Sequence, residues 1–255
     1  MTAGTSRETG REVVVAGRRA ALEAVRAGLA RRVLFARGSR ATPGLRELLD
    51  ASREAAVELR EVDREELDRL VSDHHGVVAE AVPAKPIGER ELATRGYAPG
   101  AIVVVLDGIT DPHNLGAAAR SAEAAGAELL VTRTRRAAGV SPSAVRASAG
   151  ALLHLPHARV ANIPRALERL KDVGFTVVGL DEGAEGTIFE ERCPVGRVAL
   201  VVGSEGSGPA RLTREACDLL VRLPMGGRVG SLNASASLAA ALYGFVLPAR
   251  ASLPS

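Results

Sequence analysis

The N-terminal part of the chain alternates short apolar runs with segments whose apolar residues recur at helical spacing. A short apolar run bounded by turn residues is typical of a strand, and a longer amphipathic segment is typical of a helix. Strands are predicted over 12–17, 31–37, 57–62 and 76–81, and helices over 18–28, 43–55 and 63–73. The pattern therefore predicts a small α/β unit at the start of the chain.

A second alternating pattern begins near residue 100, after a Pro- and Gly-rich stretch at 82–100 without sustained periodicity. The run 101–107 is almost entirely apolar, as expected of a strand that is buried on both faces. Further strands are predicted over 128–132, 157–161, 175–180, 198–203 and 219–224. Strands that alternate with helices predict a mainly parallel sheet, and ligands bind such sheets beyond the carboxyl ends of the strands.

These patterns divide the chain into four parts. We expect a disordered polar tail at 1–10, a first α/β unit at 11–82, a linker at 83–99 and a larger α/β unit at 100–250. The overall fold class is therefore α/β.

The charge of the first unit is unevenly distributed. Residues 11–40 hold eight arginines against Glu12 and Glu23, whereas residues 41–82 hold five arginines against eleven acids. Such polarity is typical of a basic strip that faces a nucleic acid, with Arg18 and Arg19 as candidates for phosphate contact, and equally typical of salt-bridged helix faces. Only 2% of the residues are aromatic, so stacking of bases on aromatic side chains is not expected to dominate any RNA binding.

The two cysteines, Cys193 and Cys217, are isolated, and no His, Cys, Asp or Glu cluster has the spacing of a metal site. A reduced, cytoplasmic protein without a metal is the natural expectation. No apolar run reaches the length of a membrane span, and the first residues lack the apolar core of a signal peptide.

Three glycine-containing loops follow predicted strands and precede predicted helices. They are "LDGITDPHNLGAAAR" at 106–120, "VVGSEGSG" at 201–208 and "LPMGGRVGSLNASASLAAALYGF" at 223–245. None has the lysine of a P-loop, the G-x-G-x-x-G order of a dinucleotide site or the G-x-S-x-G turn of a serine hydrolase. These three classes of site are therefore not favoured.

A small polar set lies in these loops: Asn114, Arg120, Glu205, Ser231 and Asn233. Taken singly, each has an ordinary structural interpretation. Asn114 and Ser231 are expected to cap the helices that follow, and Arg120 and Glu205 would be solvated charges. Because the carboxyl ends of parallel strands share one edge of a sheet, the set as a whole predicts a single polar site.

The three loops resemble the three ordered motifs of the SpoU (TrmH-like) family of RNA ribose 2′-O-methyltransferases, and within it the members that modify a guanosine of 23S rRNA. The region 11–82, with "VVAGRRAALEAV" and "DHHGVVAEA", looks like the family's RNA substrate-binding domain, which is similar to ribosomal protein L30e. The resemblance implies a trefoil-knotted (SPOUT) methyltransferase domain over 100–250. The third motif differs slightly, since "SLNASAS" replaces the usual "SLNVSVA".

The resemblance also implies a homodimer that uses S-adenosylmethionine, with rRNA as its substrate. Asn114, Arg120, Glu205, Ser231 and Asn233 would be catalytic, and Gly203, Leu223, Met225 and Leu232 would contact the cofactor, largely through backbone atoms. A guanidinium stays protonated in proteins, so Arg120 is expected to bind RNA phosphate and stabilise the developing alkoxide rather than act as a base. Glu205 would orient Arg120 or Asn114.

The loop 132–151 supplies further candidates for phosphate contact, and its alternative interpretation is a solvated loop. These candidates are Arg133, Arg135, Arg136 and Arg146. Three alternatives remain open at this point: methylation of a tRNA, methylation of an rRNA site that confers antibiotic resistance, and a non-catalytic RNA-binding or ribosome-assembly protein.

Overall fold

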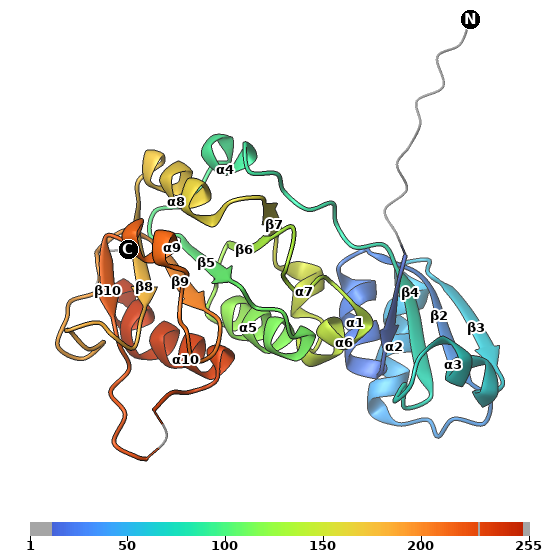
Figure 1. The fold of residues 1–255 in the computed structure, drawn as a ribbon. Helices are drawn as coiled ribbons and strands as arrows, with labels where there is room; N and C mark the ends of the chain where they lie inside the picture. The colour runs from blue at the N-terminus through green and yellow to red at the C-terminus, as the bar shows by residue number, and fades with distance from the viewer. Residues whose placement is uncertain (1–11, 229, 252–255) are drawn as a thin grey trace, which may run out of the picture. The chain divides into compact units, whose positions relative to one another are not determined.

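A computed structural model of the chain describes residues 12–228 and 230–251 (Figure 1). The tail 1–10, which we expected to be disordered, lies outside the described residues. The chain divides into two compact units that meet between Lys85 and Pro86, and each unit is described by itself.

The first unit is a four-stranded sheet with the strand order β1-β4-β2-β3. Strand β4 runs antiparallel to β1 and β2, while β2 and β3 are parallel. Its elements in chain order are β1 (Val13–Ala16), α1 (Arg18–Arg26), β2 (Ala30–Ala36), α2 (Pro43–Glu54), β3 (Glu58–Val62), α3 (Arg64–Leu70) and β4 (Val77–Ala81). All seven elements predicted for this part of the sequence are present.

The second unit is built on six parallel strands in the order β10-β8-β9-β5-β6-β7. The strands are β5 (Ile102–Asp107), β6 (Leu129–Arg133), β7 (His157–Val160), β8 (Phe175–Leu180), β9 (Arg197–Gly203) and β10 (Leu219–Val221). The helices are α4 (Glu91–Thr94), α5 (Pro112–Ala124), α6 (Pro142–Ala147), α7 (Ala151–His154), α8 (Ile163–Asp172), α9 (Arg211–Glu215) and α10 (Ala234–Ala241). A π-helical turn, η1 (Leu242–Val246), joins α10 to α11 (Leu247–Ala251).

Both faces of this sheet are buried, and strand β5 shows how. Val104 and Leu106 belong to the core that contains residues of α5 and α10, whereas Val103 and Val105 belong to the core that contains residues of α8. Successive side chains of a strand point to opposite faces, so a strand covered on both sides must be apolar throughout. The continuous apolar run in the sequence reflects this position.

The stretch 83–99, which we expected to be a linker, is largely part of the second unit. Leu92 of α4 and Tyr97 are buried in the core beside α8. The Tyr97 ring meets Phe175 edge to face, with centroids 4.8 Å apart. The boundary between the units therefore falls at 85/86, ahead of most of the predicted linker.

The segment 132–151, which we expected to be a loop, contains helix α6. Ser141 accepts a hydrogen bond from the backbone N–H of Ala144 and caps α6, whose first residue is Pro142. Helix α6 packs closely on α5 at Gly116, where an added Cβ would lie 2.5 Å from the carbonyl oxygen of Ala144. A side chain at position 116 would therefore push the two helices apart.

Candidate active site

Four neighbouring strands end side by side and bring their loops together. Asp107 at the end of β5 pairs with Gly203 at the end of β9, and Leu180 at the end of β8 pairs with both Val202 and Val221. The segments that follow these strands include all three glycine-containing loops. The expectation of one polar site at the carboxyl edge of the sheet therefore agrees with the register of the strands.

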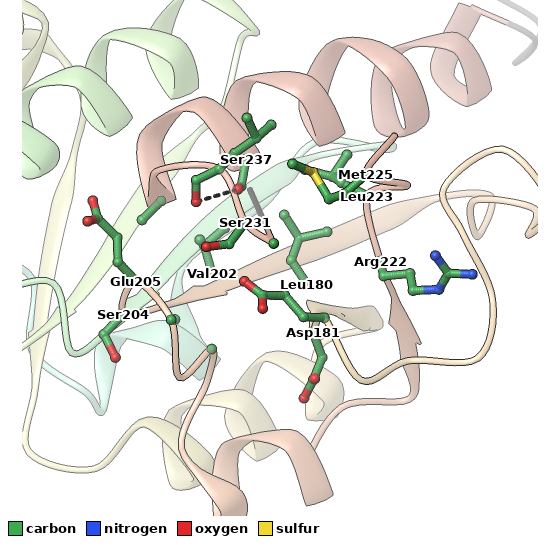
Figure 2. A pocket seen from close by; sticks show the side chains of 17 residues that line it. Leu180, Asp181, Val202, Ser204, Glu205, Arg222, Leu223, Met225, Ser231 and Ser237 are labelled. Carbon is green, nitrogen blue, oxygen red and sulfur yellow. Dashed lines mark hydrogen bonds between the residues drawn. The ribbon is translucent and has the colours of Figure 1, made fainter. Parts of the chain in front are cut away.

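A pocket that is partly open to solvent lies at this edge (Figure 2). Gly203, Leu223, Met225 and Leu232, the four residues expected to contact a cofactor, all line it, as do Glu205 and Ser231. Sequence reasoning missed further lining residues at or just after the end of β8 and on α10: Leu180, Asp181, Glu182 and Ser237. The strand-end rule could have found the three that lie at or just after the end of β8.

Three of the predicted polar residues form one hydrogen-bonded chain. Asn114 Nδ2 donates to Glu205 Oε1 at 2.8 Å, and Asn233 Nδ2 donates to Asn114 Oδ1 at 2.8 Å. A carboxylate can only accept, so Glu205 fixes which end of the Asn114 amide faces it, and Asn114 in turn fixes the orientation of Asn233. These hydrogen bonds link the first turn of α5 and the loop after β9 to the N-cap of α10.

Asn233 also caps helix α10. Its Oδ1 accepts from the backbone N–H of Ala236 at 3.0 Å and from the hydroxyl of Ser235 at 2.7 Å. The prediction that Ser231 is the cap is therefore wrong, since the helix begins at Ala234 and Asn233 is its N-cap. Ser231 instead lines the pocket.

The prediction that Asn114 caps α5 is also wrong. Helix α5 begins at Pro112, and Asp111 is its N-cap, accepting from the backbone N–H of His113 at 3.1 Å. The amide of Asn114 lies within the first turn of the helix and is left free to bond with Glu205 and Asn233.

The glycine at position 203 is required by a close backbone crossing. A Cβ there would lie 1.8 Å from the carbonyl carbon of Gly208, which is far inside contact distance. The loop closes on itself because the N–H of Gly208 donates to the carbonyl of Ser204 at 2.9 Å. This tight turn places Glu205 at the pocket edge.

A buried carboxylate, that of Asp107, also anchors the segment that follows β9. Asp107 is 3% exposed, and its Oδ2 accepts from the hydroxyl of Thr213 at 2.6 Å and from the backbone N–H of Ala210 at 3.0 Å. Its other oxygen, Oδ1, lies 3.1 Å from Arg133 Nε. Asp107 thus ties the loop that carries Glu205 to the end of β5.

Arg120 lies apart from the hydrogen-bonded chain. It is exposed on α5, and within residues 12–228 and 230–251 it has no hydrogen-bond or ion-pair partner. Six residues correspond to about 240° of rotation and to about 9 Å along the axis beyond Asn114. Of the two partners considered for Glu205, the structure pairs it with Asn114.

The other arginine candidates are dispersed. Arg135 and Arg136 are exposed beyond the end of β6, whereas Arg133 is paired with Asp107. Arg146 lies on α6, and Arg18 and Arg19 begin α1 of the first unit.

The cysteines do not provide a nucleophile. Burial raises the pKa of the Cys193 thiol to about 11 and that of Cys217 to about 12, so both remain protonated near neutral pH. Nor do the described residues contain a group of three or more His, Cys, Asp and Glu that would hold a metal ion.

In the same part of the chain, no helix combines the length and apolar character that a membrane crossing demands.

Comparison with family models matches both units. Residues 101–243 match the SpoU rRNA methylase family, and residues 14–87 match the model described as RNA 2′-O ribose methyltransferase substrate binding. The chain therefore belongs to the SpoU family and is an RNA 2′-O-methyltransferase. The resemblance and the α/β fold class predicted from the sequence are confirmed.

Individual relatives cover most of the chain. The Pseudomonas putida protein named 23S rRNA (guanosine-2′-O-)-methyltransferase RlmB is 40% identical over 208 residues, which is 80% of this chain and 83% of that protein. An uncharacterised tRNA/rRNA methyltransferase of Mycolicibacterium gilvum is 40% identical over 238 residues, covering 91% of this chain and 75% of its own length. Among solved structures, the SpoU methyltransferase AviRb of Streptomyces viridochromogenes in complex with AdoMet (S-adenosylmethionine) has a TM-score of 0.76 at 30% identity, covering 95% of this chain and 92% of that one.

Proposed function

We propose that the protein transfers a methyl group from S-adenosylmethionine to the 2′-hydroxyl of a guanosine in 23S rRNA. The observation that carries this proposal is the chain Glu205–Asn114–Asn233 beside a pocket at the carboxyl ends of parallel strands. The name of the Pseudomonas putida relative supports the choice of nucleotide and RNA.

The chemistry of the pocket fits S-adenosylmethionine. Leu180, Leu223, Met225 and Leu232 offer an apolar wall that suits an adenine ring, and the carboxylates of Glu182 and Glu205 complement a sulfonium and an ammonium group. Glu182 has no partner of its own among the described residues. The cofactor, when bound, supplies a methyl group that is activated by the positive charge of its sulfur.

Methyl transfer of this kind is an in-line displacement that needs an aligned 2′-oxygen and a route for its proton. The amides of Asn114 and Asn233, held in fixed orientations, would position the ribose beside the pocket. Arg120, whose guanidinium is free among the described residues, would bind the adjacent RNA phosphate and stabilise negative charge that develops on the 2′-oxygen.

A homodimer is part of the proposal. Phe189 and Tyr243 are 71% and 53% exposed, and an added Cβ on Gly244, next to Tyr243, would lie 3.9 Å from Phe189 Cε1. Large exposed apolar side chains are typical of an interaction surface, and the partner proposed here is a second copy of the chain. Light scattering of the purified protein should give twice the mass of the chain, and the variant F189D/Y243D should give less.

Calorimetry with S-adenosylmethionine tests the proposed activity at its first step. A single saturable site, weakened by Gly203→Ala, is the expected result. An absence of binding would favour a non-catalytic RNA-binding or ribosome-assembly protein.

A further inference from the structure

Asp107 is a buried carboxylate that has no part in the chemistry proposed above. It ends β5, is 3% exposed and does not line the pocket at the carboxyl edge of the sheet. Its Oδ2 accepts two hydrogen bonds, one from the hydroxyl of Thr213 on α9 and one from the backbone N–H of Ala210. Burying a carboxylate is costly unless its oxygens are hydrogen-bonded and its charge is compensated.

Arg133 at the end of β6 supplies the compensating charge. Its Nε lies 3.1 Å from Asp107 Oδ1, on the carboxylate oxygen that Thr213 does not use. Strand β6 is paired with β5, so Arg133 and Asp107 end neighbouring strands. Asp107 therefore joins β5 both to β6 and to α9.

The loop that carries Glu205 is closed by its own backbone. The N–H of Gly208 donates to the carbonyl of Ser204 at 2.9 Å. Because the loop is closed in this way, its position depends on the residues through which the chain enters and leaves it. The chain enters it from β9, which is paired with β5, and leaves it toward Ala210, which Asp107 holds at 3.0 Å.

The same end of β5 also leads to Asn114. Gly108, directly after Asp107, has a φ of +84°, and a Cβ added to it would lie 3.7 Å from the Cβ of Ser204. The chain thus passes close to the start of the Glu205 loop before it enters α5, whose first turn carries Asn114. Asp107 is therefore connected to both segments that supply the hydrogen bond from Asn114 to Glu205, by the chain on one side and by hydrogen bonds on the other.

We propose that Asp107 is a positioning residue for methyl transfer, which acts through Thr213 and Ala210 to keep Glu205 within hydrogen-bonding distance of Asn114. The inference rests on the proposed function for the reaction that it serves. The bond from Asn114 to Glu205 is 2.8 Å long, so a displacement of the loop by about 1 Å would break it and slow the chemical step.

Thr213→Val tests this role, because valine has a similar shape and cannot donate to Asp107. With S-adenosylmethionine and RNA both saturating, and well below the unfolding temperature of every variant, T213V should lower kcat about ten-fold. Its KM for RNA should change less than about two-fold. T213S keeps the hydroxyl and should restore kcat to near that of the parent. T213A removes the same donor with a smaller side chain, and it repeats the test if valine does not fit.

Thr132→Val is the matched control. Thr132 is 2% exposed at the end of β6, and its hydroxyl lies 2.7 Å from His157 Nε2. T132V therefore also removes a buried hydroxyl from a hydrogen bond, but this bond does not involve Asp107. T132V should lower the melting temperature, as T213V does, and should keep the kcat of the parent.

A double-mutant cycle with Asn114→Ala separates positioning from a general loss of stability. If Asp107 acts through the bond from Asn114 to Glu205, T213V should lower the kcat of N114A by less than about two-fold, although it should lower its melting temperature as it does in the parent. Unchanged kcat in T213V, an equal loss of kcat in T132V, or a further ten-fold loss in the N114A background would overturn the proposal. Failure of the parent protein to methylate any RNA would instead overturn the proposed function.

Discussion

Asn233 Nδ2 donates to Asn114 Oδ1 at 2.8 Å, although the two residues are 119 positions apart in the chain. The orientation of the Asn114 amide is itself fixed by Glu205, because Asn114 Nδ2 donates to the Glu205 carboxylate. An amide both donates and accepts, so Asn114 can make both of these hydrogen bonds at once. Neither alanine nor aspartate in its place could make both. The arrangement leads to distinct predictions for each residue.

Asn114→Ala should lower kcat by about 100-fold, because both neighbouring side chains lose their fixed orientation. Binding of S-adenosylmethionine should change little, since Asn114 does not line the pocket. A rapid-quench methyl-transfer assay and calorimetry measure the two quantities. Asn162→Ala is the matched control, because Asn162 caps α8 and its loss should cost about 1 kcal/mol of stability without slowing turnover. Equal kcat in the two variants would refute the prediction.

Asn233 has two separable roles. N233D keeps an oxygen that caps α10 but loses the donor to Asn114, whereas N233A loses both. We expect N233D to retain the parent's thermal stability and to lose most of its kcat. N233A should lose activity and also about 1 kcal/mol of stability. Ser231→Ala should leave the melting temperature unchanged, because Ser231 is not the cap.

The parent, N233D, N233A and S231A are compared by thermal denaturation and by initial rates at saturating RNA. If N233D turned over as fast as the parent, Asn233 would be a helix cap and nothing more.

Arg120→Lys keeps the positive charge but loses the planar fork that matches two phosphate oxygens. We expect kcat to fall about ten-fold in R120K and about 100-fold or more in R120A, with unchanged binding of S-adenosylmethionine. Arg165→Lys is the control, since Arg165 is exposed and paired with Glu89 away from the pocket. Full turnover of R120K with normal RNA affinity would show that fork geometry is unimportant.

Much of the sheet was predictable because strands buried on both faces leave a continuous apolar run, as 101–107 does. The first residues of the helices are harder to predict, because several residues that can cap a helix lie within a few positions of each other. At α5 and α6 the decisive signal was a capping residue directly before proline, Asp111-Pro112 and Ser141-Pro142, since proline suits the first helical position. The same signal explains why Asp111, and not Asn114, caps α5 and why 132–151 contains a helix.

The contacts of the site could not be predicted from local pattern. The pairing of Asn114 with Glu205 and Asn233 depends on the register of β5 beside β9 and on where α10 begins. Family motifs indicated that these residues belong together, but not which of them touch. The separation of Arg120 from Asn114 follows from their six-residue spacing on α5, which places the two side chains on different faces of the helix. The trefoil knot remains an expectation taken from the family.

Acid should destabilise the protein through His157. Burial, with a smaller effect of the charge of Arg159, lowers the pKa of His157 from 6.5 to about 4. The unfolded chain therefore takes up this proton more readily than the folded chain. The contribution to the free energy of unfolding is fully present above about pH 6.5 and is lost as the pH falls through 4, by up to roughly 3 kcal/mol.

Urea unfolding at pH 7 and pH 4.5 measures this effect. In His157→Gln the pH dependence over this range should be smaller, whereas His113→Gln, at an exposed position, should behave as the parent does. Equal pH dependence in the parent and in His157→Gln would contradict the assignment.

The most direct test of the central claim is a map of 2′-O-methylation. The purified protein is incubated with S-adenosylmethionine and total RNA that lacks the modification, and protected linkages are mapped after partial alkaline hydrolysis. We predict one newly protected guanosine in 23S rRNA, and none with Asn114→Ala. Protection in tRNA instead, or methyl incorporation that leaves every linkage sensitive to alkali, would contradict the account.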